Sequence, residues 1–387
     1  MFLLLVGCSF HVPAAGRSDG SVGDDGGDGG IDAGTLGCIR DVDANRFFSC
    51  AARSDGTAWC WGDGQSRQLG DGMTTNRSTP VRVGTLSNIT QVATASRMAY
   101  ALDAAGTMWA WGLNDVGQLG DGTTTDHGDP RAVPGLTNVV EIDAGRGHVC
   151  ARTGGGNVYC WGYNSDQQVG NGMTGQNRLT PFLVVANATQ LTAGGRHTCA
   201  LLTTGEIMCW GDNAKGEMGL GRFTGDEPPT VIPGFTAVEV GAGGRQTCAR
   251  KADRTVWCFG ENRFGQVGVT GATEFAVPTQ VPGIDDAIQL MIGGRRSCAR
   301  RASGEVWCWG EAMFGNSGTG QATIGNEAPH AVAALAGASV MVSSAYHACA
   351  VTANGVLGCT GRNSHGQLGD TTLTPRSGYV PVALSCP

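Results

Sequence analysis

Apolar and polar residues alternate in short runs that recur along almost the whole chain. The run Val140-Glu141-Ile142-Asp143-Ala144 alternates side chain by side chain, and a similar run, Pro80-Val81-Arg82-Val83, is led by a proline. Alternation over four to eight residues is typical of β-strands with one buried face, and the runs lack the 3.6-residue period of a helix. The pattern therefore predicts many short strands joined by turns.

A glycine preceded in most cases by an aromatic residue marks a repeat of about fifty residues. The seven marks are Trp61-Gly62, Trp111-Gly112, Trp161-Gly162, Trp210-Gly211, Phe259-Gly260, Trp309-Gly310 and Thr360-Gly361. A second mark, such as Gly117-Gln118-Leu119-Gly120, follows about seven residues later. Seven repeats with four short strands in each predict an all-β fold, a seven-bladed β-propeller.

Composition supports this prediction and excludes two classes of protein. Glycine accounts for 64 of 387 residues and only 15% of residues are charged, which favours strands and tight turns over helices. The net charge is −7, and an acidic chain without a basic tract is a poor nucleic-acid binder. Every apolar run is shorter than the roughly 18 residues that a membrane-spanning helix needs. We therefore expect no nucleic-acid partner and no integral membrane protein.

The first 37 residues differ from the repeats. Leu5-Val6-Gly7-Cys8 resembles the lipobox of bacterial lipoproteins, in which the cysteine becomes lipid-modified. Only seven residues precede Cys8, so we expect a truncated signal or a true start upstream; the alternative is an apolar start with an ordinary thiol. The Gly- and Asp-rich residues that follow predict a flexible tether. The predicted organisation is a signal and lipobox over 1–8, a tether over 9–37 and a propeller over 38–387.

Fifteen cysteines predict disulfides and an oxidising compartment. Six pairs are ten residues apart: Cys50 and Cys60, Cys150 and Cys160, Cys199 and Cys209, Cys248 and Cys258, Cys298 and Cys308, and Cys349 and Cys359. In the second repeat Tyr100 and Ala110 occupy both positions, so the two cysteines are absent together. Each pair flanks a hairpin turn, across which opposed residues lie within disulfide range. Zinc is the competing interpretation, but zinc ligand pairs typically have two to four intervening residues.

Two further cysteines lie at the ends of the repeats. A bond between Cys38 and Cys386 would hold the last blade to the first, and we predict that bond. Setting Cys8 aside for lipid attachment leaves an even number of cysteines, which supports the assignment.

The repeat motifs resemble those of a known family. The pattern Ala-Gly-x-x-His-x-x-Ala, Gly-x-Val, Trp-Gly-x-Asn and Gly-Gln-Leu-Gly is similar to the regulator-of-chromosome-condensation repeat, over roughly residues 39–385. Residues 145–162 and 194–210 match it best. The resemblance implies a propeller used as a binding platform. Its relatives include a nucleotide-exchange factor, a β-lactamase inhibitor and a plant photoreceptor, so the function does not follow from the fold.

The sequence contains no strong catalytic, metal or cofactor motif. His148, His197 and His347 occupy one repeat position in three different repeats, and we expect each to bond local backbone. Residues 170–175 fit G-x-G-x-x-G, but no helix follows to present its N-terminus to a phosphate. We therefore predict no metal and no cofactor.

These features favour an exported binding module of the cell envelope or outer surface, lipid-anchored and monomeric, that engages a protein or glycan. One alternative is a hydrolase or lyase with an active site on the propeller axis, since such sites combine residues far apart in sequence. The other is nucleotide exchange on a GTPase, which the even repeat spacing disfavours because it leaves no room for a large inserted wedge.

An arginine precedes the cysteine position by three or four residues in six of the seven repeats. These arginines are Arg46, Arg97, Arg146, Arg196, Arg245 and Arg295. Residues 194–198 are similar to the loop with which the photoreceptor relative faces its partner. Since guanidinium groups bind carboxylates and phosphates, we predict that one arginine-rich face contacts an anionic partner. The alternative is that each arginine caps carbonyl groups or pairs with a carboxylate of the next blade.

Overall fold

The computed structural model describes residues 38–313, 315–319 and 325–384. Cys8, the tether over 9–37 and Cys386 lie outside the described residues. Their predicted roles stay predictions.

The described chain forms seven four-stranded antiparallel sheets that follow one another in sequence. The first three blades are β1 (Ile39–Asn45), β2 (Phe48–Arg53), β3 (Ala58–Gly62) and β4 (Arg77–Arg82); β5 (Ile89–Thr94), β6 (Met98–Asp103), β7 (Met108–Gly112) and β8 (His127–Ala132); and β9 (Val139–Ala144), β10 (His148–Thr153), β11 (Val158–Gly162) and β12 (Arg178–Val185).

The remaining four blades repeat the same order. They are β13 (Ala188–Ala193), β14 (His197–Leu202), β15 (Glu206–Asp212) and β16 (Asp226–Thr236); β17 (Glu239–Ala242), β18 (Gln246–Arg250), β19 (Val256–Glu261) and β20 (Glu274–Gln280); β21 (Ala287–Ile292), β22 (Arg296–Arg301), β23 (Val306–Ala312) and β24 (Gly325–Ala331); and β25 (Val340–Ser343), β26 (His347–Val351), β27 (Leu357–Gly361) and β28 (Arg376–Pro381).

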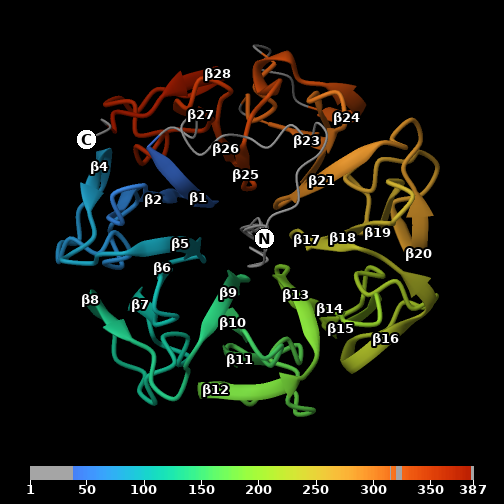
Figure 1. The fold of residues 1–387 in the computed structure, drawn as a ribbon, viewed down its shortest axis with the longest axis horizontal. Coiled ribbons are helices and arrows are strands. Elements are labelled where there is room, and N and C mark those ends of the chain that lie inside the picture. The colour runs from blue at the N-terminus through green and yellow to red at the C-terminus, as the bar shows by residue number, and fades with distance from the viewer. Residues whose placement is uncertain (1–37, 314, 320–324, 385–387) are drawn as a thin grey trace, which may run out of the picture.

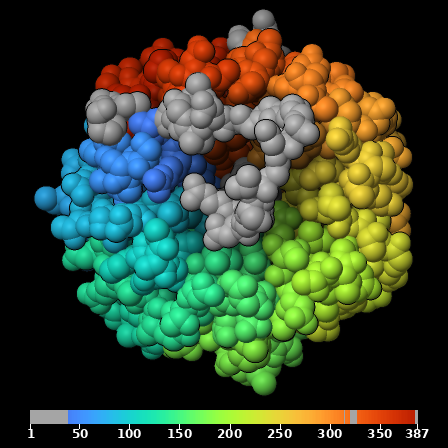
Figure 2. Space-filling view, viewed as in Figure 1, coloured from blue at the N-terminus to red at the C-terminus, as the bar shows by residue number. Residues whose placement is uncertain are grey.

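The blades stand around one axis, with the first strand of each innermost and the fourth at the rim (Figure 1). In the space-filling view the first and last blades lie side by side, so the ring is closed (Figure 2). One 3₁₀ turn, η1 (Ala333–Leu335), is the only helical element in the described part of the chain. The predicted all-β seven-bladed propeller is confirmed. None of the described residues belongs to a helix long and apolar enough to cross a membrane.

The six predicted cysteine pairs stand directly opposite each other on the second and third strands of their blades. Their Cα atoms are 4.0–4.1 Å apart, and all twelve side chains are buried. As the spacing predicts, disulfides join Cys50 to Cys60, Cys150 to Cys160, Cys199 to Cys209, Cys248 to Cys258, Cys298 to Cys308, and Cys349 to Cys359.

The blade without a cysteine pair fills the same space differently. In the second blade Tyr100 stands opposite Ala110, and its hydroxyl donates to the Gln118 carbonyl at 2.8 Å. Outside the hairpins, Cys38 is also disulfide-bonded. Its predicted pairing with Cys386 stays a prediction.

The hairpin turn between the second and third strands of each blade contains a left-handed residue. Glycine occupies that position in six blades, with φ between +73° and +85°, whereas Arg254 takes it in the fifth blade with φ +69°. A side chain in this region costs roughly 1–2 kcal/mol because Cβ approaches the following carbonyl oxygen.

Replacing Arg254 with glycine should therefore stabilise the propeller. We expect Arg254→Gly to raise the free energy of unfolding by about 1 kcal/mol in urea titrations. The matched control is Gly304→Ala, because Gly304 has φ +85° and a Cβ added there would meet no neighbouring atom within 4 Å. The free energy of unfolding of Gly304→Ala should fall by a similar amount. A lower free energy of unfolding in Arg254→Gly would contradict the proposed strain at Arg254.

Tryptophan side chains hold adjacent blades together. A tryptophan precedes the glycine mark in five blades; it is fully buried, and its indole N–H donates to a glutamine carbonyl of the preceding blade. The donor–acceptor distances are 2.9–3.1 Å for Trp61, Trp111, Trp161, Trp210 and Trp309. Trp61 reaches Gln367 of the last blade, so the same contact closes the ring.

The three repeated histidines also connect blades. Nε2 of His148, His197 and His347 lies 2.7–2.9 Å from a hydroxyl of the next blade, supplied by Thr198, Thr247 and Ser49. Each hydroxyl donates to a backbone carbonyl, so it accepts from the histidine. Burial lowers the pKa of all three histidines to about 3, which keeps them neutral. The expected bond to local backbone is wrong, because Nε2 of each ring bonds a hydroxyl of the neighbouring blade instead.

Polar side chains link the innermost strands to one another. Asp41 of β1 accepts the Val92 N–H of β5 at 2.8 Å, and Gln190 of β13 bonds both backbone groups of Val240 in β17 at 2.9 Å. Equivalent links are made by Asp43, Gln91, Glu141, Asp143 and Glu239. These buried side chains thus hold neighbouring blades together around the axis.

The buried Asp41 makes stability depend on pH. Burial raises the pKa of Asp41 from 3.8 to about 7, outweighing the hydrogen bonds from Val92 and Val42 that lower it. Between those two values the folded protein holds a proton that the unfolded chain releases, so the free energy of unfolding falls as pH rises through the window. In urea titrations, the free energy of unfolding of Asp41→Asn should fall less between about pH 4 and pH 7 than that of the unchanged protein. Equal pH dependence in both proteins would contradict this assignment.

Candidate functional site

The turns between the first and second strands of all blades lie on one face, because every blade has the same strand order. The structure places the six predicted arginines in these turns: Arg46, Arg97, Arg146, Arg196, Arg245 and Arg295. The long loops between the third and fourth strands reach the same face. This surface is called the arginine face below.

The arginine face is hollowed over blades 1 to 4. An open depression of about 640 Å³ is lined by Arg46, Arg97, Arg146 and Arg196, one from each blade. Arg97 is exposed, and the other three are half-buried. The structure thus brings together four of the six predicted arginines.

Three arginines of the face pair with carboxylates. Arg196 lies 3.4 Å from Asp166, Arg245 lies 3.5 Å from Asp212, and Arg295 lies 3.1 Å from Glu311. Arg295 also stacks on Phe264, 4.2 Å from the ring centroid. For these three arginines, the alternative prediction of pairing with carboxylates therefore holds, with partners both in the same blade and in the neighbouring blade.

The residue after each glycine mark supplies two of these three carboxylates, Asp212 and Glu311. It is acidic in blades 1, 4, 5 and 6, as Asp63, Asp212, Glu261 and Glu311, whereas blades 2 and 3 have Leu113 and Tyr163. The Arg97 guanidinium makes no ion pair with any of the described residues. Positive charge on the face is consequently least compensated around Arg97. This arginine and its neighbours in the depression, Arg46 and Arg146, are called the cationic sector.

Aromatic side chains border the cationic sector where the last blade meets the first. Tyr346 stands at the repeat position that arginine holds in other blades, and its hydroxyl accepts from Arg46 at 3.0 Å. Arg46 and Arg362 both lie over the Phe47 and Tyr346 rings, at 5.1–5.7 Å from the centroids. The His365 ring lies 4.9 Å from the Phe47 ring, tilted by 44°, and also lines the depression. Sequence reasoning missed Tyr346, although its place as the seventh member of the arginine series could have revealed it.

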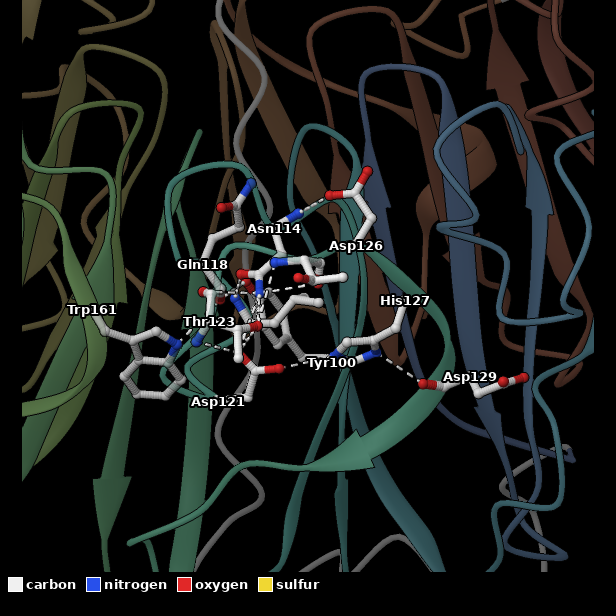
Figure 3. A network of polar contacts seen from close by, with 11 residues as sticks. Tyr100, Asn114, Gln118, Asp121, Thr123, Asp126, His127, Asp129 and Trp161 are labelled. Carbon is white, nitrogen blue, oxygen red and sulfur yellow. Dashed lines mark hydrogen bonds and ion pairs between the residues drawn. The ribbon is translucent and has the colours of Figure 1, made fainter.

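A polar network joins the second and third blades beside the depression, and Figure 3 shows its members. The Gln118 carbonyl accepts from both the Tyr100 hydroxyl and the Trp161 indole, at 2.8 and 3.1 Å. Its side-chain oxygen accepts the Val116 N–H, and its amide donates to Asp115 at 2.9 Å. Gln118 is thereby fixed between two blades at the edge of the depression.

The asparagine of the Trp-Gly-x-Asn motif shapes the loops of this face. The Asn114 side-chain oxygen accepts the Leu119 N–H at 2.9 Å, while its amide donates to Asp121 and to the Thr123 carbonyl (Figure 3). In four other blades the asparagine side-chain oxygen likewise accepts the backbone N–H of the residue five positions later. These asparagines are Asn164, Asn213, Asn262 and Asn363. The motif is therefore a structural device that orders each loop, and it is not a ligand set.

The described residues contain no group of three or more histidine, cysteine, aspartate or glutamate side chains placed to hold a metal ion. The acidic residues of the inner strands accept backbone N–H groups of the next blade, as shown above. The arginine face is consequently the strongest candidate for a functional surface.

Two models of the regulator of chromosome condensation (RCC1) repeat match the sequence. One covers residues 55–102, 105–152 and 155–201, and the other covers residues 39–68, 139–168, 188–217, 237–266 and 341–367. Together they span more than half of the chain. No curated protein sequence matches it.

Solved structures with the same architecture share about a fifth of their residues with this chain. Prp20p of Saccharomyces cerevisiae, described with its binding to Gsp1p and histones, is 20% identical over 86% of this chain and 87% of its own, with a TM-score of 0.75. Human WBSCR16 is 21% identical over 85% and 94%, with a TM-score of 0.75. A structure of yeast RCC1 (Prp20) with Kap60 is 19% identical over 97% and 92%, again at 0.75. At these identities the likeness concerns the fold.

Proposed function

The chain belongs to the regulator of chromosome condensation (RCC1) repeat family, and from that premise we propose that it is an exported binding module that engages an anionic protein through its arginine face. The observation that carries the proposal is the depression lined by one arginine from each of four consecutive blades. Arginine side chains offer planar donor groups to carboxylates, and several of one sign attract an anionic partner at long range.

The fold and the cysteines support this assignment. Yeast RCC1 (Prp20) is described with the protein partners Gsp1p, histones and Kap60, so a propeller of this architecture serves protein binding. Six buried disulfide-bonded pairs indicate an oxidising, extracellular setting. Lipid attachment at Cys8, with the acidic tether as a spacer, would hold the propeller at the envelope or outer surface.

Affinity capture tests the proposal. The full chain, immobilised in oxidised form, should retain a protein from a cell-envelope extract, and Arg97→Glu/Arg146→Glu should lose it. The matched control is Arg245→Glu/Arg295→Glu, which carries the same charge change at arginines outside the depression. Capture that persists in the first variant, or that survives protease treatment of the extract as a glycan would, contradicts the proposal.

The lipid anchor has a separate test. Full-length protein should partition into the detergent phase of Triton X-114, and Cys8→Ser should move it to the aqueous phase. Equal partitioning of the two proteins would remove the lipid anchor from the proposal without affecting the binding face.

A further inference from the structure

We propose that the depression receives an extended acidic polypeptide segment, whose carboxylates contact the cationic sector and whose apolar side chains contact the lining between the arginines. This inference rests on the proposed function and deepens it, because it names the chemistry of the partner and the blades that bind it.

The distribution of charge selects the sector. Arg196, Arg245 and Arg295 are each within 3.5 Å of a carboxylate of the protein itself. A partner that used Arg245 or Arg295 would have to displace an ion pair that is already in place. Arg97 is exposed, and its guanidinium pairs with none of the described carboxylates. An anionic ligand therefore gains most beside Arg97, in the part of the depression formed by blades 1 to 3.

The lining between the arginines is partly apolar. Leu113 and Val116 of the second blade are half-buried there, and Phe47 and the exposed Tyr163 border them on either side. These side chains offer contact area to apolar groups of a ligand. A ligand with charged groups alone would leave these apolar side chains exposed to solvent.

An extended polypeptide matches both features. Side chains of an extended chain alternate between two directions, so residues two apart point the same way at about 7 Å spacing. A segment that mixes acidic and apolar residues can thus place carboxylates at arginines and apolar groups between them. Each carboxylate can accept two N–H groups from one guanidinium.

Two carboxylates in the same lining disfavour a nucleic acid. Asp63 and the exposed Asp115 lie within the depression between the arginines. A nucleic-acid strand carries a phosphate at every nucleotide, and these two carboxylates would repel it. A polypeptide can present an uncharged residue at those points, and the net charge of −7 adds to the repulsion of a dense polyanion.

Fluorescence anisotropy with defined probes tests this inference on the full oxidised chain. The probes are a labelled peptide in which glutamate and valine alternate at every second position with serine between them, so that both point to the same side, its glutamine counterpart, and a single-stranded oligonucleotide of equal charge. We expect only the glutamate peptide to bind, with affinity falling at least about tenfold as salt rises from about 50 to 300 mM.

Matched variants locate the site. Arg97→Glu/Arg146→Glu should weaken peptide binding by about tenfold or more, whereas Arg245→Glu/Arg295→Glu should change it less than about threefold. Leu113→Asn should weaken the valine-containing peptide more than an all-glutamate peptide. Thermal melts of each variant show whether a loss of binding is caused by unfolding. If the double variant unfolds, Arg97→Glu alone tests the site, because the Arg97 side chain is exposed and its replacement should leave the fold intact.

Three outcomes would overturn the inference. They are absence of peptide binding, peptide binding that is indifferent to Arg97 and Arg146, and equal or tighter binding of the oligonucleotide through the same arginines. If an envelope protein still requires Arg97 and Arg146 while the peptide does not bind, the acidic segment is wrong and the proposed function stands. If neither ligand depends on these arginines, both fail.

Discussion

Reduced protein is expected to melt far below oxidised protein, with the loss of cooperative folding near 37 °C when all hairpin cysteines are thiols. Each disulfide closes a short loop between the second and third strands of a blade, with a sequence separation of 10 residues. Chain entropy assigns about 2.7 kcal/mol to such a loop, and removal of a native disulfide typically costs 2–5 kcal/mol. Six of them are large against a net stability of roughly 5–15 kcal/mol, even though the contributions do not add fully.

The measurement is a pair of thermal melts, one of oxidised protein and one of protein refolded in reductant, with thiols counted after denaturation. The double variant Cys150→Ala with Cys160→Ala isolates one bond and should lower the free energy of unfolding by about 2.7 kcal/mol. The second blade is an internal control, because Tyr100 and Ala110 occupy the positions of the cysteine pair there. The loss of stability caused by Tyr100→Phe should therefore be the same with and without reductant. An unchanged melt with every cysteine free would refute the stabilising role.

Trp161→Ala is expected to cost about 3–5 kcal/mol, because it empties a fully buried site between two blades. The variant removes the indole contact with the Gln118 carbonyl as well as the apolar ring. Trp161→Phe should cost much less, about 1–2 kcal/mol, since the Tyr100 hydroxyl still satisfies that carbonyl. Phe259 holds the equivalent position in the fifth blade, fully buried.

Urea titrations of these variants measure the effect. Trp109→Ala is the matched control, because Trp109 is only partly buried and donates to Asp103 of its own blade at 3.2 Å. The control should lose clearly less stability than Trp161→Ala. Equal losses would show that contacts between blades do not dominate the stability of the ring.

Charge at the arginine face shows where sequence reasoning reached its limit. The spacing of the repeats predicted that six arginines lie in equivalent turns, and in the structure they lie in the turns between the first and second strands. Which of them are compensated depends on partners such as Asp166, 30 residues from Arg196 along the chain. No pattern of spacing identifies such a pair, since it forms only when two loops of adjacent blades meet at the same face.

The sequence by itself determined the number of blades, the strand pairing within each blade and the cysteine pairs. These follow from local rules: alternation gives strands, glycine permits the left-handed turn, and a symmetric hairpin sets residues ten apart directly opposite each other. The partner of each repeated histidine and the position of the depression were decided only by the tertiary structure. Both depend on how one blade lies against the next, as does the contact between Arg46 and Tyr346, which are 300 residues apart and meet only because the ring closes.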